Sequence, residues 1–191
     1  CGTFSIARFR KMISGPRPVR FRGQFLWGRP DLSAMERIRV ELANTLLLHM
    51  LALCEAVSAR GGVHFLEHPQ DPGVAPFPSI WVLPEVLEME ERTGAVRSRL
   101  DQCEFEGLSV KPTCISGTIL DLLSSDGRRC THGKGSHGQH YGRSPDGSFR
   151  TAVQPHARSL RSVLSILFYG CWNRVKGRVV TPGCRRPLCD T

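Results

Sequence analysis

The chain of 191 residues has the length of one domain. Its residues are 40% hydrophobic and 23% charged, and this hydrophobic share is large enough to form a core, which excludes a wholly disordered chain. Its formal charge of +9 favours a polyanionic partner, because net charge bears on partners and solubility rather than on fold. The amino-terminal part lacks the apolar run of a signal peptide, so we expect a soluble, intracellular protein, with the nucleus as one option and no membrane partner.

Eight cysteines are spread irregularly along the chain, at positions 1, 54, 103, 114, 130, 171, 184 and 189. Small disulfide scaffolds are shorter and denser in cysteine, so we interpret most of these residues as reduced core side chains. The chain does not begin with methionine, and we expect further residues upstream.

Residues 1–30 hold seven basic side chains and no acidic one, and several Gly and Pro residues interrupt any regular element. This composition predicts a mobile basic loop. A solvated linker without a function is the simpler interpretation of the same pattern.

The next segment predicts a long helix. Ser33 is a candidate N-cap, Glu36 completes a capping box, and Gly61 with Gly62 ends the helix. The stretch TLLLHMLALCEAV at 45–57 is apolar nearly all round, as expected of a helix packed against a sheet. We expect this stretch to be too short to span a bilayer.

Helix and strand patterns alternate in the segment that follows. VHFLE at 63–67 predicts a short strand that ends in Glu67, and a helix is predicted over 79–92, with an irregular start because of Pro84. Residues 95–105 and 111–119 predict two further strands. The alternation indicates an α/β architecture with a largely parallel sheet, in which Glu67 would lie at the carboxyl end of a strand, where ligand sites form.

The carboxyl-terminal third has a different composition. Residues 124–149 are rich in Gly, His and Ser and predict a loop, and residues 157–170 have the apolar spacing of a final helix. Residues 171–191 are basic, contain three cysteines and predict a tail without a regular element.

Several short motifs, taken in order, resemble cytosine-5 DNA methyltransferases, in particular divergent members associated with mobile elements. The opening CGTFSIAR resembles the nucleophile loop of this family, and FLEHP at 65–69 resembles the strand end that carries its catalytic glutamate. DQCEFEGLSVKPT at 101–113 is similar to a later block of the divergent members. CTHGKGSHG and GSFRTAV are similar to their terminal blocks, so the resemblance covers roughly residues 1–165.

This resemblance implies the carboxyl-terminal half of a Rossmann-like class I methyltransferase sheet. Cys1 would be the nucleophile that adds to carbon 6 of a flipped cytosine, and Glu67 would support the addition at ring nitrogen 3. S-adenosylmethionine would donate the methyl group, and DNA would be the partner. The implied phosphate contacts are Arg8, Arg10, Lys11, Arg17, Arg20 and Arg22.

The implied organisation is a partial methyltransferase-like domain over 1–170 followed by the tail. Its parts would be the basic loop 1–30, a helix and strand core over 31–123, and the loop and final helix over 124–170. His68 replaces an asparagine of the family, and Glu106 interrupts a Phe-Gly pair. The family's glycine-rich cofactor segment precedes the nucleophile loop, so we expect the cofactor-binding residues to lie outside this chain and the chain alone to be inactive. A non-catalytic nucleic-acid-binding or decayed mobile-element fragment is the alternative.

A cluster of soft ligands lies in the Gly/His-rich loop. Cys130, His132, His137 and His140 fall within eleven residues, and zinc is bound by such side chains. Zinc sites usually draw on two close pairs separated by a longer loop, so the default interpretation is a surface loop without metal. A small zinc-binding module is the third hypothesis for this chain.

Overall fold

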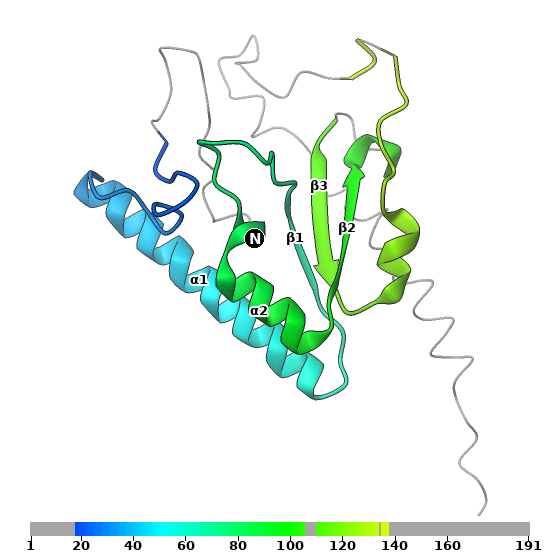
Figure 1. The fold of residues 1–191 in the computed structure, drawn as a ribbon, viewed down its shortest axis with the longest axis horizontal. Helices are drawn as coiled ribbons and strands as arrows, with labels where there is room; N and C mark the ends of the chain where they lie inside the picture. Colours follow the sequence, from blue (N-terminus) through cyan, green and yellow to red (C-terminus); the bar gives the residue numbers. More distant parts are fainter. Residues whose placement is uncertain (1–17, 106–109, 134, 138–191) are drawn as a thin grey trace, which may run out of the picture.

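The computed structural model describes residues 18–105, 110–133 and 135–137 (Figure 1). Two helices and three strands form the regular structure of this part: α1 (Ala34–Ala59), β1 (Phe65–Pro69), α2 (Pro84–Thr93), β2 (Val96–Asp101) and β3 (Pro112–Gly117). Three short 3-10 helices complete it: η1 (Ile80–Val82), η2 (Gln102–Phe105) and η3 (Leu120–Ser125). Helices and a sheet therefore coexist as predicted.

The three strands form one sheet in the order β1-β3-β2, and both neighbouring pairs are antiparallel. The expectation of a largely parallel sheet is therefore wrong for the described strands. The physical reason is the short connection from β2 to β3, since parallel neighbours need a crossover of about a dozen residues or more. β1 and β2 do run in the same direction and are joined through α2, but β3 lies between them.

α1 begins and ends where the local signals predict. The hydroxyl of Ser33 accepts a hydrogen bond from the N–H of Glu36, and the N–H of Ser33 donates to Oε2 of Glu36 at 2.9 Å, which completes the capping box. At the other end, Gly61 has a φ of +71°, a left-handed conformation that favours glycine. The capping prediction is confirmed.

α1 packs against the sheet as predicted, but only one stripe of this helix is buried although its second half is apolar nearly all round. Leu47 and Leu51 lie in the core, whereas Leu42 and Leu53 are exposed on the opposite side. α1 has 26 residues and is long and apolar enough to cross a membrane by length and composition alone. This is weak support for a membrane span, because the core helix of a soluble protein passes the same test.

Each face of the sheet packs against a different set of elements (Figure 1). Leu66 of β1 and Cys114 of β3 join α1, η1 and α2 in the larger core, while Ile115 of β3 meets Leu122 of η3 on the other face. Pro84 stands at the first turn of α2, directly after η1, which confirms the irregular start predicted there.

The segment 18–30 packs along α1 without regular structure. Arg20 is fully buried, and its guanidinium donates to the carbonyl oxygens of Leu26 and Val40. Residues 18–30 therefore pack against the core, and their mobility stays a prediction. The predicted helix at 157–170, the tail at 171–191 and most of the predicted basic loop lie outside the described residues.

Candidate metal centre

The carboxyl end of β2 and a distant loop are joined by backbone pairing. The N–H of Arg99 donates to Oδ1 of Asp126 at 2.6 Å, and the N–H of Gly127 donates to the carbonyl of Arg99 at 2.9 Å. The N–H of Asp101 donates to the carbonyl of Arg128 at 2.9 Å. Residues 126–128 thus run along the outer edge of β2 and deliver the residues that follow to the end of that strand.

Two carboxylates then fix the backbone of the loop. Oδ2 of Asp101 accepts a hydrogen bond from the N–H of Cys130 at 2.8 Å, and Oε1 of Glu104 accepts from the N–H of Thr131 at 3.2 Å. Asp101 ends β2 and Glu104 lies in η2, so both acceptors belong to regular elements. They hold Cys130 and His132 beside η2.

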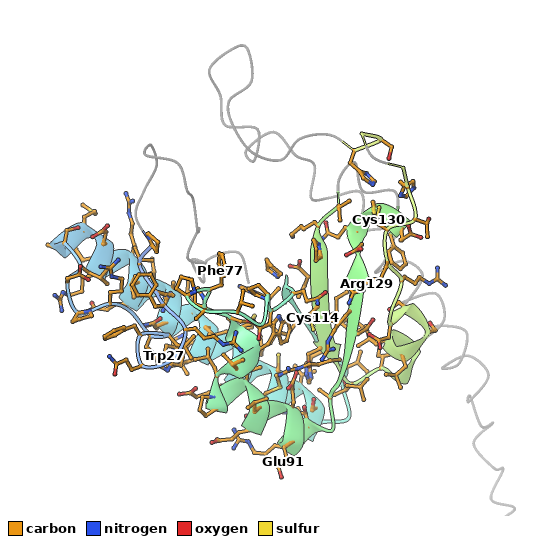
Figure 2. All side chains as sticks on the ribbon, turned by 45° about the horizontal axis from the view of Figure 1, so that its top comes forward. Trp27, Phe77, Glu91, Cys114, Arg129 and Cys130 are labelled. Atoms are coloured by element: carbon orange, nitrogen blue, oxygen red, sulfur yellow. The ribbon has the colours of Figure 1, made fainter. Side chains whose placement is uncertain are left out.

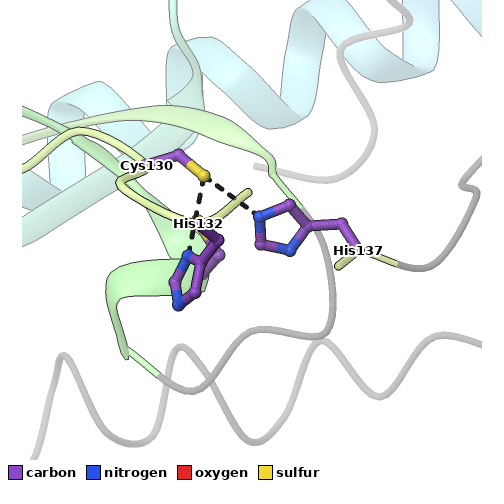
Figure 3. A group of neighbouring side chains, drawn as sticks. Cys130, His132 and His137 are labelled. Atoms are coloured by element: carbon purple, nitrogen blue, oxygen red, sulfur yellow. Dashed lines mark hydrogen bonds between the residues drawn. The ribbon is translucent and has the colours of Figure 1, made fainter. Parts of the chain in front are cut away.

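Four ligand side chains meet at this point. Cys103 of η2 lies with Cys130, His132 and His137, and their ligand atoms are all within 4.8 Å of one another. Sγ of Cys130 is 3.0 Å from Nε2 of His137 and 3.6 Å from Nδ1 of His132. Dashed lines mark these two contacts in Figure 3. In Figure 2, Cys130 lies at the opposite end of the described structure from Glu91 of α2.

The size of the cluster suits a small cation. In a tetrahedral zinc site with bonds of about 2.0–2.3 Å, neighbouring ligand atoms lie roughly 3.3–3.8 Å apart. Ligand atoms that lie between 3.0 and 4.8 Å apart therefore need only small movements, inward for the wider pairs and outward for Cys130 and His137. Two sulfurs and two imidazoles favour zinc over magnesium or calcium, which prefer oxygen ligands.

The two sulfurs differ in exposure. Cys103 is only 7% exposed, whereas Cys130 is half-buried. Burial, followed by the hydrogen bond with Cys130 and the nearby acidic groups, raises the pKa of the Cys103 thiol to about 12. A bound cation would act in the opposite direction and favour the thiolate, since coordinated thiols are deprotonated.

Glu104 also lies near one of the imidazoles. Its Oε1 is 3.6 Å from Nδ1 of His132, the side chain of which is 44% exposed. The rings of His132 and His137 meet edge to face, with centroids 4.9 Å apart. The cluster therefore sits at the surface, with Cys103 beneath it and the histidines toward solvent.

The sequence-based set of candidate ligands was incomplete. Cys130, His132 and His137 come together as that hypothesis requires, and His140 lies outside the described residues. Cys103 was missed because it lies 27 residues before Cys130, in a different element. Zinc sites usually draw on two close pairs, whereas here one distant cysteine joins three close ligands in the spacing C-x26-C-x-H-x4-H, so the sequence offered no clear signal for Cys103.

Glu67 occupies the middle of β1 and not its end. The strand continues through His68 and Pro69, which pair with Cys114 and Thr113 of β3. The predicted position at a strand terminus is therefore wrong. The Glu67 carboxylate lies 3.1 Å from Nζ of Lys111, and both side chains are 24% exposed.

The predicted phosphate contacts fall into two groups. Arg20 is buried against α1, and Arg22 forms a two-bond ion pair with Asp71 at 2.6 and 3.0 Å. Their role in holding DNA stays a prediction, and in this conformation both side chains have protein partners. The other predicted site residues lie outside the described part of the chain: Cys1, Arg8, Arg10, Lys11 and Arg17.

No protein-family model, curated protein or solved structure matches the chain.

Proposed function

We propose that this chain is a zinc-binding module in which Cys103, Cys130, His132 and His137 hold one Zn²⁺. The observation that carries the proposal is the convergence of four soft ligand atoms within 4.8 Å from two segments far apart in sequence. Two thiolates and two neutral imidazoles would balance the charge of the ion, and zinc commonly takes this ligand set.

The role we infer for the ion is structural. Four protein ligands close a tetrahedral site and leave no position for a substrate or an activated water. Residues 126–137 have no regular secondary structure in the described part, and backbone pairing to β2 ends at Arg128. The ion would fasten the rest of this loop to η2, so metal binding would contribute directly to the folding of this region.

Metal analysis of the purified full chain tests this proposal. We expect one zinc per chain, and substitution by Co²⁺ should give the intense visible absorption of a tetrahedral site with thiolate ligands. A zinc content near zero after expression in zinc-supplemented medium, together with an octahedral Co²⁺ spectrum, would overturn it.

We retain the methyltransferase-like function as a second, separate proposal for a longer protein. It rests on the resemblance of the motifs alone, with Cys1 as nucleophile, Glu67 as acid, S-adenosylmethionine as donor and DNA as partner. A protein extended upstream should form a covalent adduct with DNA that contains 5-fluorocytosine, and Cys1→Ser should abolish it. An adduct that survives this substitution contradicts the role of Cys1.

DNA binding without catalysis makes a different prediction. In that case the chain should bind DNA with an affinity that falls steeply with salt, and it should bind no S-adenosylmethionine. Binding that is insensitive to salt would argue against contacts with phosphate.

A further inference from the structure

We propose that the centre is also a redox switch, in which hydrogen peroxide joins Cys103 to Cys130 in a disulfide and releases the zinc. This inference rests on the proposed function, because it describes how the same site is regulated. It concerns which sulfurs react and what happens to the ion.

The positions of the cysteines single out one pair. The sulfurs of Cys103 and Cys130 belong to one cluster of ligand atoms within 4.8 Å. The other cysteines in the described part, Cys54 of α1 and Cys114 of β3, are buried in the larger core and belong to no such cluster. An oxidant that reaches the protein surface therefore meets the Cys103–Cys130 pair before either core cysteine.

Exposure sets the order of events. Cys130 is half-buried, and the loop residues around it at 131–133 and 135–136 are exposed. Cys103 lies beneath it, 7% exposed. Hydrogen peroxide therefore reaches Cys130 first, and Cys103 is in position to complete the disulfide from below.

The chemistry balances with peroxide as the only oxidant. The Cys130 thiolate attacks one oxygen of hydrogen peroxide, so that an S–O bond forms, the O–O bond breaks and hydroxide leaves. The Cys103 thiolate then attacks the Cys130 sulfur, so that the S–S bond forms and a second hydroxide leaves. Two protons convert both hydroxides to water, the two sulfurs have lost two electrons in total, and Zn²⁺ is released without a change in charge.

The contacts that hold the loop around Cys130 determine which residues the disulfide would release. The backbone of Cys130 is held by Asp101, and a disulfide would hold its side chain to η2. His132 and His137 would lose the ion, and a disulfide sulfur at Cys130 has no proton to donate to either imidazole. Residues 132–133 and 135–137 would then be released, while residues 126–131 stay on the edge of β2 and on η2.

The test uses the full, zinc-loaded chain treated with increasing hydrogen peroxide. Released zinc is measured with a chromogenic chelator, and the cross-linked peptides are identified by mass spectrometry after blocking of free thiols. We expect one zinc released for each Cys103–Cys130 disulfide, and a thiol reductant with added zinc should restore the starting state. Cys54→Ala should behave like the wild-type chain, because Cys54 lies in the core on α1.

The outcomes separate the two proposals. If zinc is bound but stays bound under peroxide, or leaves while other cysteines are cross-linked, the switch is wrong and the structural zinc centre stands. If the untreated chain binds no zinc, the proposed function fails and the switch fails with it.

Discussion

The N–H of Cys130 donates to Oδ2 of Asp101 at 2.8 Å, so the last residue of β2 fixes the backbone of a cysteine that lies 29 residues later in the chain. Asp101 is itself 7% exposed, and its other oxygen lies 3.5 Å from the guanidinium of Arg129. A buried acceptor held in place in this way orients a ligand that it does not coordinate. This relationship leads to the first prediction.

Asp101→Ala should weaken zinc binding about 10–100-fold, because partners that orient metal ligands typically have effects of this size. Zinc affinity is measured by competition with a chelator of known affinity. Asp31→Ala is the matched control, since Asp31 pairs with Arg29 at the surface near the start of α1 and should leave the affinity unchanged. Equal effects of the two substitutions would show that Asp101 has no specific part in the centre.

Leu47→Ala should lower the free energy of unfolding by about 2–5 kcal/mol, since it removes a side chain that is 0% exposed and leaves a cavity. Leu53→Ala, on the same helix but 63% exposed, should change it by less than about 0.5 kcal/mol. Both values come from urea unfolding at saturating zinc, because bound metal adds to the apparent stability. A large loss for Leu53→Ala would mean that the open side of α1 is covered in solution.

Alkaline pH should destabilise the protein in part through Cys114. Burial raises the pKa of this thiol to about 11 from a usual value of 9.0. The folded state then holds the proton more tightly than the unfolded state does, so the stabilisation is complete below pH 9 and is lost as the pH rises toward 11. The loss attributable to Cys114 is of the order of 2 kcal/mol.

Unfolding free energies measured between pH 8 and pH 11 check this prediction. The free energy of unfolding should fall less steeply with rising pH in Cys114→Ala than in the wild-type chain. This comparison of slopes does not depend on the stability that the smaller side chain loses at every pH. Parallel declines in the two proteins would rule out Cys114 as a source of the pH dependence.

The helix boundaries were predictable from the sequence, because the signals that set them act between neighbouring residues. The capping box at Ser33, the glycine that ends α1 and the break before Pro84 each act within a few residues. The antiparallel direction of β3 relative to β2 was available in the sequence, because the predicted strands at 95–105 and 111–119 are too close for a parallel crossover. The place of β3 between β1 and β2 depends on pairing between residues distant in the sequence, and the strand patterns did not reveal it.

Three of the four residues of the candidate site were predictable, for the same reason. Cys130, His132 and His137 were grouped because they are close in sequence. Cys103 joins them only because residues 126–128 pair with the edge of β2, which the residue pattern of that loop does not reveal. Glu67 was predicted at a strand end because the hydrophobic pattern ends there. The strand in fact continues for two further residues.

The zinc content of the full chain and of Cys103→Ser tests the central claim most directly, with Cys54→Ala as a buried-cysteine control. Far-ultraviolet circular dichroism would first confirm that each variant keeps its helices. We predict one zinc per chain for the wild type and for Cys54→Ala, and a content near zero for Cys103→Ser after exposure to a competing chelator. A folded Cys103→Ser protein that retains zinc like the wild type, or a wild-type chain that binds none, would contradict the account.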